Sequence, residues 1–134
     1  MIYFAYGANL CRAHMALWCP HSEPLVAAEL SDHRLVFRVW ADVVPSPGDR
    51  VPGALYEVAD EDRASLEEFE DCPGLCGCLG VQVLTSQGPV DAVTYRMHGA
   101  RPFAPPSLEY LALIEQGYED WRLDPGLIPV KVAV

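Results

Sequence analysis

Ile2-Tyr3-Phe4-Ala5-Tyr6-Gly7-Ala8-Asn9-Leu10, close to the start of the chain, carries the strongest structural signal in the sequence. Its apolar and aromatic first half predicts a buried β-strand. The strand breaks at Gly7 and Asn9, the two residue types that most easily adopt a positive φ, and a helix-compatible segment follows. A strand, a tight turn and a helix N-terminus bring backbone N–H groups together, where they can hold an anion. The stretch therefore predicts a strand–turn–helix unit with the potential to bind an anionic group.

Length and composition describe one globular domain over residues 1–134. A chain of this size buries roughly two-thirds of its unfolded surface, and 51% apolar with 21% charged residues is typical of a full core. The net charge is −10 and the nine Lys and Arg are scattered, which argues against nucleic acid as a partner. There is no apolar run of the roughly 18 residues that a membrane span needs, and no basic segment before the first strand. We expect a cytoplasmic protein without a membrane partner.

Cysteine usage leaves a second class of function open. An odd number of cysteines in an unsecreted chain suggests free thiols. The segment Cys72-Pro-Gly-Leu-Cys76-Gly-Cys78 raises the alternative of a thiol or zinc protein. Its C-x3-C-x-C spacing is unusual for zinc, and no CxxC or HxxxH pair completes it. We therefore expect free thiols, without a metal or cofactor.

The first half of the chain predicts one helix and several strands. A helix is expected from Cys11 to about Leu17, ended by Pro20. Residues 24–39 read as one long bent strand, or two strands around Ser31-Asp32-His33. The prolines and the glycine in Ala41–Pro52 predict a loop, followed by a strand over Val51–Val58.

The second half predicts two helices around a hairpin. The clearest helix is Asp60–Glu70, with Asp60 as its N-cap. Leu79–Thr85 and Val90–Met97 read as a hairpin. A last helix is expected to open at Pro105 and Pro106 and to end at Gly117, before a terminal edge strand over Leu127–Val134. The element order indicates an α+β fold, a mixed barrel or open sheet flanked by helices.

Glu70 is the strongest candidate for chemistry. It lies four residues after Leu66, on the stripe of its helix that faces the core, whereas Glu67 and Glu68 are turned away. Burial at a helix C-terminus raises a carboxyl pKa towards the range of a general acid or base. The alternative for Glu70 is a structural ion pair with an arginine. The sequence holds no G-x-S-x-G, P-loop or G-x-G-x-x-G motif.

The chain resembles the gamma-glutamylcyclotransferase-like family in several segments that occur in register. They are Tyr3-Phe4-Ala5-Tyr6-Gly7-Ala8-Asn9-Leu10, Ser46-Pro47-Gly48-Asp49-Arg50-Val51, Gly53-Ala54-Leu55-Tyr56, Leu66-Glu67-Glu68-Phe69-Glu70, Tyr95, and Ala104-Pro105-Pro106-Ser107-Leu108-Glu109-Tyr110. The resemblance covers about residues 2 to 118. It implies a small closed β-barrel flanked by helices.

The resemblance also implies an activity and a site. The α-amine of a γ-glutamyl group attacks its own γ-carbonyl, and 5-oxoproline and an amine are released. Glu70 matches the catalytic glutamate as general acid and base, and Tyr110 matches a tyrosine that closes the pocket. The substrate-binding loop corresponds to Tyr6, Gly7, Ala8, Asn9 and Leu10. The implied partner is a small γ-glutamyl compound, and a homodimer stays open.

Two departures from the family pattern matter. The signature serine is Ala8 here, which requires the loop to act through its backbone. The aromatic residue expected at the start of the strand after the glutamate falls near Cys76. This second departure keeps an alternative open, a non-catalytic member of the same fold that binds a small ligand.

Overall fold

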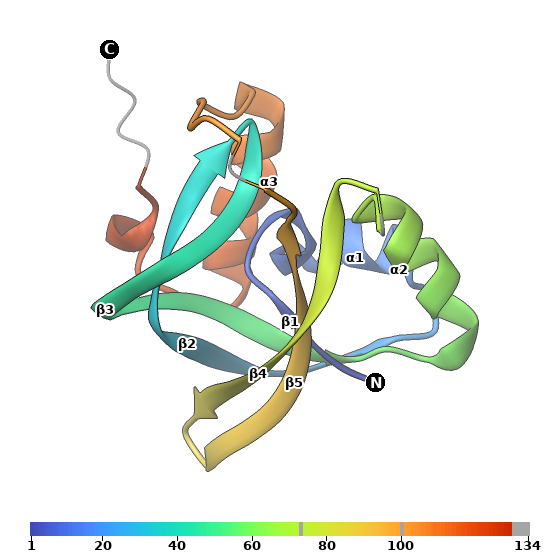
Figure 1. The fold of residues 1–134 in the computed structure, drawn as a ribbon. Coiled ribbons are helices and arrows are strands. Elements are labelled where there is room, and N and C mark those ends of the chain that lie inside the picture. The colour runs from blue at the N-terminus through green and yellow to red at the C-terminus, as the bar shows by residue number, and fades with distance from the viewer. Residues whose placement is uncertain (73, 100, 130–134) are drawn as a thin grey trace.

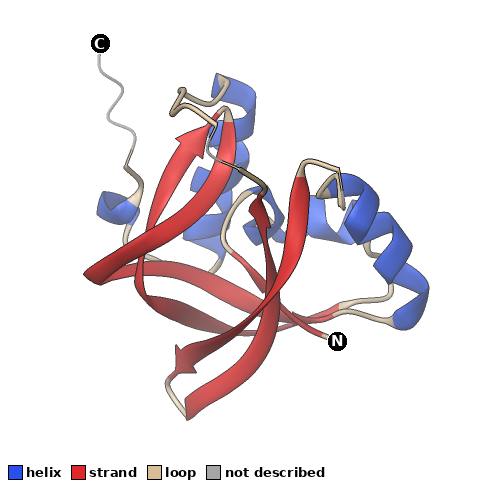
Figure 2. Ribbon diagram, in the orientation of Figure 1, coloured by secondary structure: helices blue, strands red, loops and turns tan. Residues whose placement is uncertain are grey.

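The computed structural model describes residues 1–72, 74–99 and 101–129 and contains a closed barrel of five strands with three α-helices beside it (Figures 1 and 2). The strands are β1 (Ile2–Ala5), β2 (Glu23–Arg38), β3 (Trp40–Glu57), β4 (Cys76–Thr85) and β5 (Gly88–Met97). The α-helices are α1 (Arg12–Trp18), α2 (Arg63–Phe69) and α3 (Leu108–Asp120). Three short 3-10 helices, η1 (Ala8–Leu10), η2 (Asp60–Asp62) and η3 (Pro125–Leu127), complete the order. The predicted α+β barrel is confirmed.

The barrel is mixed because β1 has two kinds of neighbour. The strand order is β1-β3-β2-β4-β5, closed by a parallel contact between β1 and β5 in which Tyr3 faces Val93. β1 runs antiparallel to β3, and β4 and β5 form the predicted hairpin. Helices α1 and α2 lie together on one side of the barrel and α3 on another, while the turn of the hairpin projects away from them (Figure 1). The helices therefore surround the end of β1 and the loop that follows it.

The hydrophobic core is one contiguous cluster, and β1 is buried along most of its length. Tyr3, Phe4 and Ala5 are all buried, which explains why the strand is a continuous apolar run rather than an alternating one. Gly53 in β3 allows this close packing. A Cβ at Gly53 would lie 2.3 Å from the Ala5 carbonyl oxygen and 2.6 Å from the Phe4 ring.

The predicted loop over Ala41–Pro52 is wrong, since these residues belong to β3. Within the described chain, β3 pairs with β1 only over Ala54–Glu57, so its earlier part has β2 as its one neighbour and prolines fit there. The register of β2 and β3 shifts beside Asp32, which has φ +59°. Opposite it, Gly48 has φ +86° and donates its backbone N–H to Asp32 Oδ1 at 2.9 Å. β2 is thus the long bent strand, and the proline-rich segment is an irregularity within a strand.

Three further expectations about helix and chain ends need correction. Gly117 does not end the last helix, which continues to Asp120. A Cβ on Gly117 would lie 2.3 Å from Leu10 Cβ and 2.8 Å from the Cys11 backbone nitrogen, so glycine allows α3 to contact the loop after β1. Asp60 is not an α-helical N-cap, because it starts η2 and the α-helix begins at Arg63. The expected terminal strand begins in η3 rather than in a strand, and residues 130–134 lie outside the described residues.

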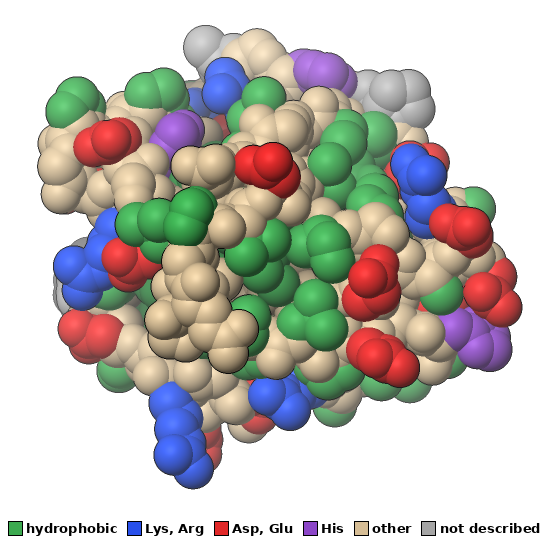
Figure 3. Space-filling model, turned by 90° about the horizontal axis from the view of Figure 1, so that it is seen from below, with side chains coloured by type: hydrophobic (Ala, Val, Ile, Leu, Met, Phe, Trp, Pro, Cys, Tyr) green, Lys and Arg blue, Asp and Glu red, His purple; other side chains and the backbone are tan. Residues whose placement is uncertain are grey.

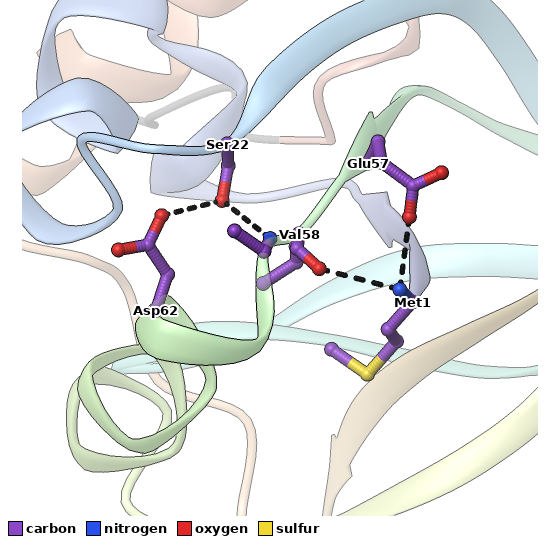
Figure 4. A network of polar contacts seen from close by, with 6 residues as sticks. Met1, Ser22, Glu57, Val58 and Asp62 are labelled. Carbon is purple, nitrogen blue, oxygen red and sulfur yellow. Dashed lines mark hydrogen bonds and ion pairs between the residues drawn. The ribbon is translucent and has the colours of Figure 1, made fainter.

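A polar network ties the start of the chain and the start of α2 to the end of β3 (Figure 4). The Met1 ammonium donates to Glu57 Oε2 at 2.9 Å and to the Val58 carbonyl oxygen at 3.2 Å. Asp62 is 3% exposed and accepts hydrogen bonds from the His21 backbone N–H (2.9 Å) and from Ser22 Oγ (2.8 Å). Since a buried carboxylate needs such donors, Asp62 ties the residue before α2 to the segment before β2.

One face of the surface shows acidic side chains that do not gather into a single charged field (Figure 3). On the face in Figure 3, acidic and basic side chains are interspersed around patches of hydrophobic side chains. None of the helices in the described part of the chain is long and apolar enough to cross a membrane.

Candidate active site

Glu70 occupies the end of α2, and the backbone beyond it turns sharply. The Glu70 backbone N–H still bonds to the Leu66 carbonyl oxygen at 2.9 Å, so Glu70 keeps the helical direction. Asp71 then adopts a φ of +53°, and its carbonyl oxygen accepts from the backbone N–H groups of Leu75 (2.8 Å) and Cys76 (3.1 Å). This closed turn is a left-handed helix end built on a non-glycine residue. It holds Glu70 facing the end of β1.

The Glu70 carboxylate meets two side chains from the start of the chain. The Tyr3 hydroxyl donates to Oε1 at 3.3 Å, and Asn9 Nδ2 donates to the same oxygen at 3.4 Å. Asn9 Nδ2 also donates to the Tyr3 hydroxyl oxygen at 3.2 Å. Strand β1, helix η1 and the end of α2 therefore converge on one carboxylate oxygen.

Burial raises the pKa of Glu70 from 4.5 to about 7, and the hydrogen bond from Tyr3 offsets part of this rise. The direction agrees with the expectation from the helix pattern. An arginine partner, the structural alternative, is not found among the described residues that hydrogen-bond to Glu70. A carboxyl group with a pKa near neutrality can both accept and return a proton at physiological pH.

The loop after β1 is held by its own backbone and by β5. The Tyr6 hydroxyl donates to the Tyr95 carbonyl oxygen at 2.5 Å, and the Leu10 N–H bonds to the Gly7 carbonyl oxygen at 3.0 Å. A side chain at Gly7 would be tight, because a Cβ there would lie 3.1 Å from the Tyr110 hydroxyl and 3.2 Å from Ala41 Cβ. Gly7 has φ −115°, and neither it nor Asn9 has the positive φ that its residue type permits.

Tyr110, on α3, closes the site from the other side. Its hydroxyl accepts a hydrogen bond from the Ala41 backbone N–H at 3.1 Å, and its ring meets Trp40 edge-on with centroids 4.9 Å apart. Burial raises the pKa of Tyr110 to about 12, an effect that hydrogen bonds from the backbone of Ala41 and Ala8 partly offset and the nearby Glu70 charge increases. Tyr110 is thus a neutral hydroxyl that bridges α3, the loop after β1 and the start of β3.

These elements enclose a cavity of about 470 Å³ and a smaller recess of about 30 Å³. Glu70, Ala8 and Tyr110 line both spaces, together with Ala41 and Phe69. The recess is also lined by Tyr3, Tyr6, Gly7 and Asn9. The larger cavity continues past Trp40, Asp71, Leu75, Cys76, Ser107, Glu109 and Leu113. Glu70 lies where the two spaces meet.

The structure brings most of the sequence-predicted site residues together, but it places Leu10 elsewhere. Leu10 is fully buried, lines neither space, and its carbonyl oxygen accepts from Trp121 Nε1 at 2.9 Å. Leu10 therefore packs in the core and anchors the loop through the Trp121 hydrogen bond. Sequence reasoning missed Tyr3, although it was within the quoted stretch, because nothing in a strand pattern says which side chain reaches a helix end. It missed Trp40 because the neighbouring segment was expected to be a loop.

The cysteine cluster adjoins this cavity without forming a metal site among the described residues. Cys72, Cys76 and Cys78 are free thiols, and of these Cys76 lines the cavity. Burial, together with the nearby Glu70 and Asp42 charges, raises the pKa of Cys76 to about 12. Cys76 is therefore a neutral thiol in the cavity wall, near the place where the resemblance led us to expect an aromatic residue.

Comparison with solved structures identifies the fold class. A structure titled gamma-glutamyl cyclotransferase superposes with a TM-score of 0.82 at 29% identity, and the match covers 90% of this chain and 79% of that one. A human structure of a protein titled uncharacterized superposes with a TM-score of 0.85, also at 29% identity, and covers 93% of this chain and 82% of that one. The barrel and its helices are thus those of the gamma-glutamyl cyclotransferase fold.

Sequence comparison identifies the family. The family model described as gamma-glutamyl cyclotransferase, AIG2-like, matches residues 3–123. The human gamma-glutamylcyclotransferase is 30% identical over 133 residues, which cover 89% of this chain and 70% of the human protein. A mouse gamma-glutamylaminecyclotransferase is 35% identical over 89 residues, covering 63% of this chain and 56% of the mouse protein. This chain belongs to the gamma-glutamyl cyclotransferase, AIG2-like family.

Proposed function

We propose that this chain is a γ-glutamyl cyclotransferase that converts a small γ-glutamyl amide to 5-oxoproline and a free amine. The observation that carries the proposal is Glu70, a carboxyl group with a pKa of about 7 at the junction of the recess and the larger cavity. Relatives named for this reaction support it. The nucleophile belongs to the substrate, so the protein has to hold a bent conformer and move protons.

The recess of about 30 Å³ has room for one small group, so it is assigned to the carboxylate or oxyanion end of the glutamyl part, and the rest of that part is assigned to the adjoining region of the larger cavity. The Leu10 and Cys11 backbone N–H groups already bond to the carbonyl oxygens of Gly7 and Ala8. The Ala8 backbone likewise bonds to the Tyr110 hydroxyl. The proposal therefore gives the α-carboxylate, or the oxyanion that develops on the γ-carbonyl, to the backbone N–H groups of Gly7 and Asn9. A backbone role is compatible with alanine where the family signature has serine.

Glu70 is assigned both proton transfers. As the carboxylate it accepts a proton from the α-nitrogen, which forms the new C–N bond to the γ-carbon. As the acid it returns that proton to the leaving nitrogen when the original amide C–N bond breaks. A higher pKa would favour the second step and weaken the first, so a value near 7 serves both.

The larger cavity is assigned to the leaving group, and its lining favours an amine without a carboxylate. Trp40, Leu75 and Leu113 supply apolar surface, while Asp71 and Glu109 supply negative charge. No Lys or Arg is found among the described residues that line it. An anionic leaving group would meet like charges without a cationic partner, whereas a neutral or cationic amine would not. We therefore infer γ-glutamylamines as the preferred substrate class, ahead of γ-glutamyl amino acids.

Cys76 favours one alternative, a member of the fold that binds the ligand without turning it over. A thiol in the cavity wall is smaller than an aromatic ring and leaves that side of the ligand less constrained. Loss of positioning reduces rate more than binding. The retained Glu70 argues for turnover.

A substrate panel tests the proposal. Purified protein is incubated with γ-glutamyl-putrescine, γ-glutamyl-ethylamide, γ-glutamyl-alanine and glutathione, and 5-oxoproline is quantified by chromatography. Release from the first two, at higher kcat/KM than from the last two, is expected. Binding of these compounds without 5-oxoproline would support the non-catalytic alternative. A preference for γ-glutamyl-alanine would keep the reaction but contradict the leaving-group assignment.

A further inference from the structure

The two oxygens of the Glu70 carboxylate have different surroundings. Both hydrogen bonds that Glu70 accepts from described side chains end on Oε1, at 3.3 Å from Tyr3 and 3.4 Å from Asn9. The carboxylate lines the cavity at the same time. One oxygen is therefore anchored to the protein, and Oε2 is left for exchange with a ligand.

The direction of the Tyr3 hydrogen bond is set by Asn9. An amide nitrogen can only donate, so the Tyr3 oxygen accepts from Asn9 Nδ2 at 3.2 Å and its own proton is left for Glu70. While Glu70 is ionised, the reverse orientation of the Asn9 amide would place its carbonyl oxygen beside Glu70 Oε1, where two acceptors repel. The chain Asn9–Tyr3–Glu70 thus has one consistent direction, and hydrogen bonds linked in this way reinforce each other.

Among the described residues, no cationic side chain hydrogen-bonds to the Glu70 carboxylate in place of Tyr3 and Asn9. The titratable groups whose pKa the charge of Glu70 affects come from several elements. They are Tyr3 on β1, Tyr6 after β1, Cys19 after α1, Cys72 before β4, Cys76 on β4, Tyr95 on β5 and Tyr110 on α3. Burial raises the pKa of each of them, so all are neutral near pH 7. The other acids nearby add only like charge: Asp71 and Glu109 line the cavity, and Asp42 on β3, which acts with Glu70 on Tyr6 and Cys76, is paired with Arg38 at 2.9 Å.

We propose that Tyr3 is a positioning residue for Glu70: its hydroxyl, oriented by Asn9, holds Oε1 and leaves Oε2 as the oxygen that exchanges the proton with substrate. The statement that Oε2 exchanges the proton rests on the proposed function, since it needs Glu70 to be the proton carrier. The statement that Tyr3 holds Oε1 concerns the carboxyl group alone and can be tested without a substrate. Tyr3 is 3% exposed and lines the recess beside Glu70.

The test removes one hydroxyl and follows the Glu70 carboxyl directly. Protein labelled with ¹³C-glutamate is titrated by NMR, and the Glu70 signal is assigned by its loss in Glu70→Gln. In Tyr3→Phe the midpoint is expected to rise by about one pH unit, the effect of losing a long hydrogen bond to a charged group. The acid limb of kcat/KM moves with it, so activity falls about fivefold at pH 7 and recovers above pH 9.

Tyr118→Phe is the matched control. Tyr118 is equally buried, and its hydroxyl has no hydrogen-bond partner among the described residues, so the Glu70 titration should stay where it is. Asn9→Ala keeps the Tyr3 hydroxyl but removes the bond that orients its proton and the second donor to Oε1, so the midpoint is expected to rise here too. This second variant also tests the chain if Tyr3→Phe folds poorly.

The outcomes separate the two proposals. If γ-glutamyl compounds are not turned over but Tyr3→Phe still raises the Glu70 midpoint, the proposed function fails and the anchoring of Oε1 stands. If turnover is found but neither Tyr3→Phe nor Asn9→Ala moves the midpoint and the acid limb, the role given to Tyr3 is overturned. A uniform loss of kcat at every pH, with an unchanged midpoint, would overturn it as well.

Discussion

Glu70→Gln should stabilise the fold at alkaline pH, because burial makes the charged carboxylate costly. Glutamine keeps the size of the side chain and an oxygen that accepts from Tyr3, and removes only the ionisation. In the folded protein the pKa of Glu70 is about 7 against an ordinary value of 4.5. A difference of about 2.5, at 1.36 kcal/mol for each pKa unit, amounts to about 3 kcal/mol.

The sign follows from the proton balance. Between pH 4.5 and 7 the folded state holds the Glu70 proton more tightly than the unfolded state does, so stability falls as the pH rises through this window and levels off above it. Because part of this window lies below pH 5, the stability change between pH 5 and pH 8 is about 2.5 kcal/mol. Glu70→Gln has no carboxyl group to ionise and does not lose this stability. The difference in free energy of unfolding between Glu70→Gln and the parent protein should therefore grow by that amount from pH 5 to pH 8.

Urea denaturation of both proteins at pH 5 and pH 8 measures this change directly. Glu68→Gln, on the exposed face of the same helix, is the matched control and should differ from the parent protein by less than about 0.5 kcal/mol at either pH. A stability difference between Glu70→Gln and the parent protein that is the same at pH 5 and pH 8 would refute a desolvated Glu70.

Three further predictions concern packing, anchoring and specificity. Gly117→Ala should lower the free energy of unfolding by about 1–2 kcal/mol, since overpacking against Leu10 outweighs the gain in helix propensity. Thermal melts measure this change. In the same melts Gly80→Ala should be close to neutral, because a Cβ at Gly80 would meet no atom within 4 Å. Asp62→Ala should cost about 1–3 kcal/mol in urea titrations, because the His21 N–H and Ser22 Oγ lose their acceptor; an unchanged midpoint would show that water replaces the carboxylate. Replacing Asp71 and Glu109 together by Asn and Gln should raise kcat/KM for γ-glutamyl-alanine relative to γ-glutamyl-putrescine by about tenfold, and an unchanged ratio would mean that the cavity charge does not select the leaving group.

Much of the fold could be predicted because local and tertiary preferences agree in this chain. The strand at Ile2–Ala5, the helix after it and the β4–β5 hairpin all follow from apolar pattern and turn residues. The segment Ala41–Pro52 could not be predicted, because its prolines are compatible with a strand only where one edge lacks a partner. The early part of β3 lacks a second neighbour because β1 is too short to reach it, and this pairing is set only when the barrel assembles.

Gly117 shows the same limit for a helix. A glycine near the end of a helical pattern usually marks a C-terminus. Here it lies inside α3, and its missing side chain makes room for Leu10. The two residues are far apart in the chain, so the close approach that requires glycine cannot be read from local sequence.

The candidate site could be predicted in part, through residue spacing. The inward position of Glu70 and the direction of its pKa follow from the helix period and burial. The hydrogen bonds from Tyr3 and Asn9 could not be predicted, because they need the end of α2 to face β1 across the fold. The acidic lining of the larger cavity was also out of reach, since Asp71 and Glu109 come from separate elements.

The pH dependence of kcat/KM for 5-oxoproline release, compared between the parent protein and Glu70→Gln, bears most directly on the account. A γ-glutamylamine is the substrate, and Glu68→Gln is carried as the control. If Glu70 carries the proton, activity is expected to rise with pH through a midpoint near 7. Activity is expected to fall by about 100-fold or more in Glu70→Gln. A Glu70→Gln protein that retains the parent rate and the parent pH profile would contradict the role given to Glu70.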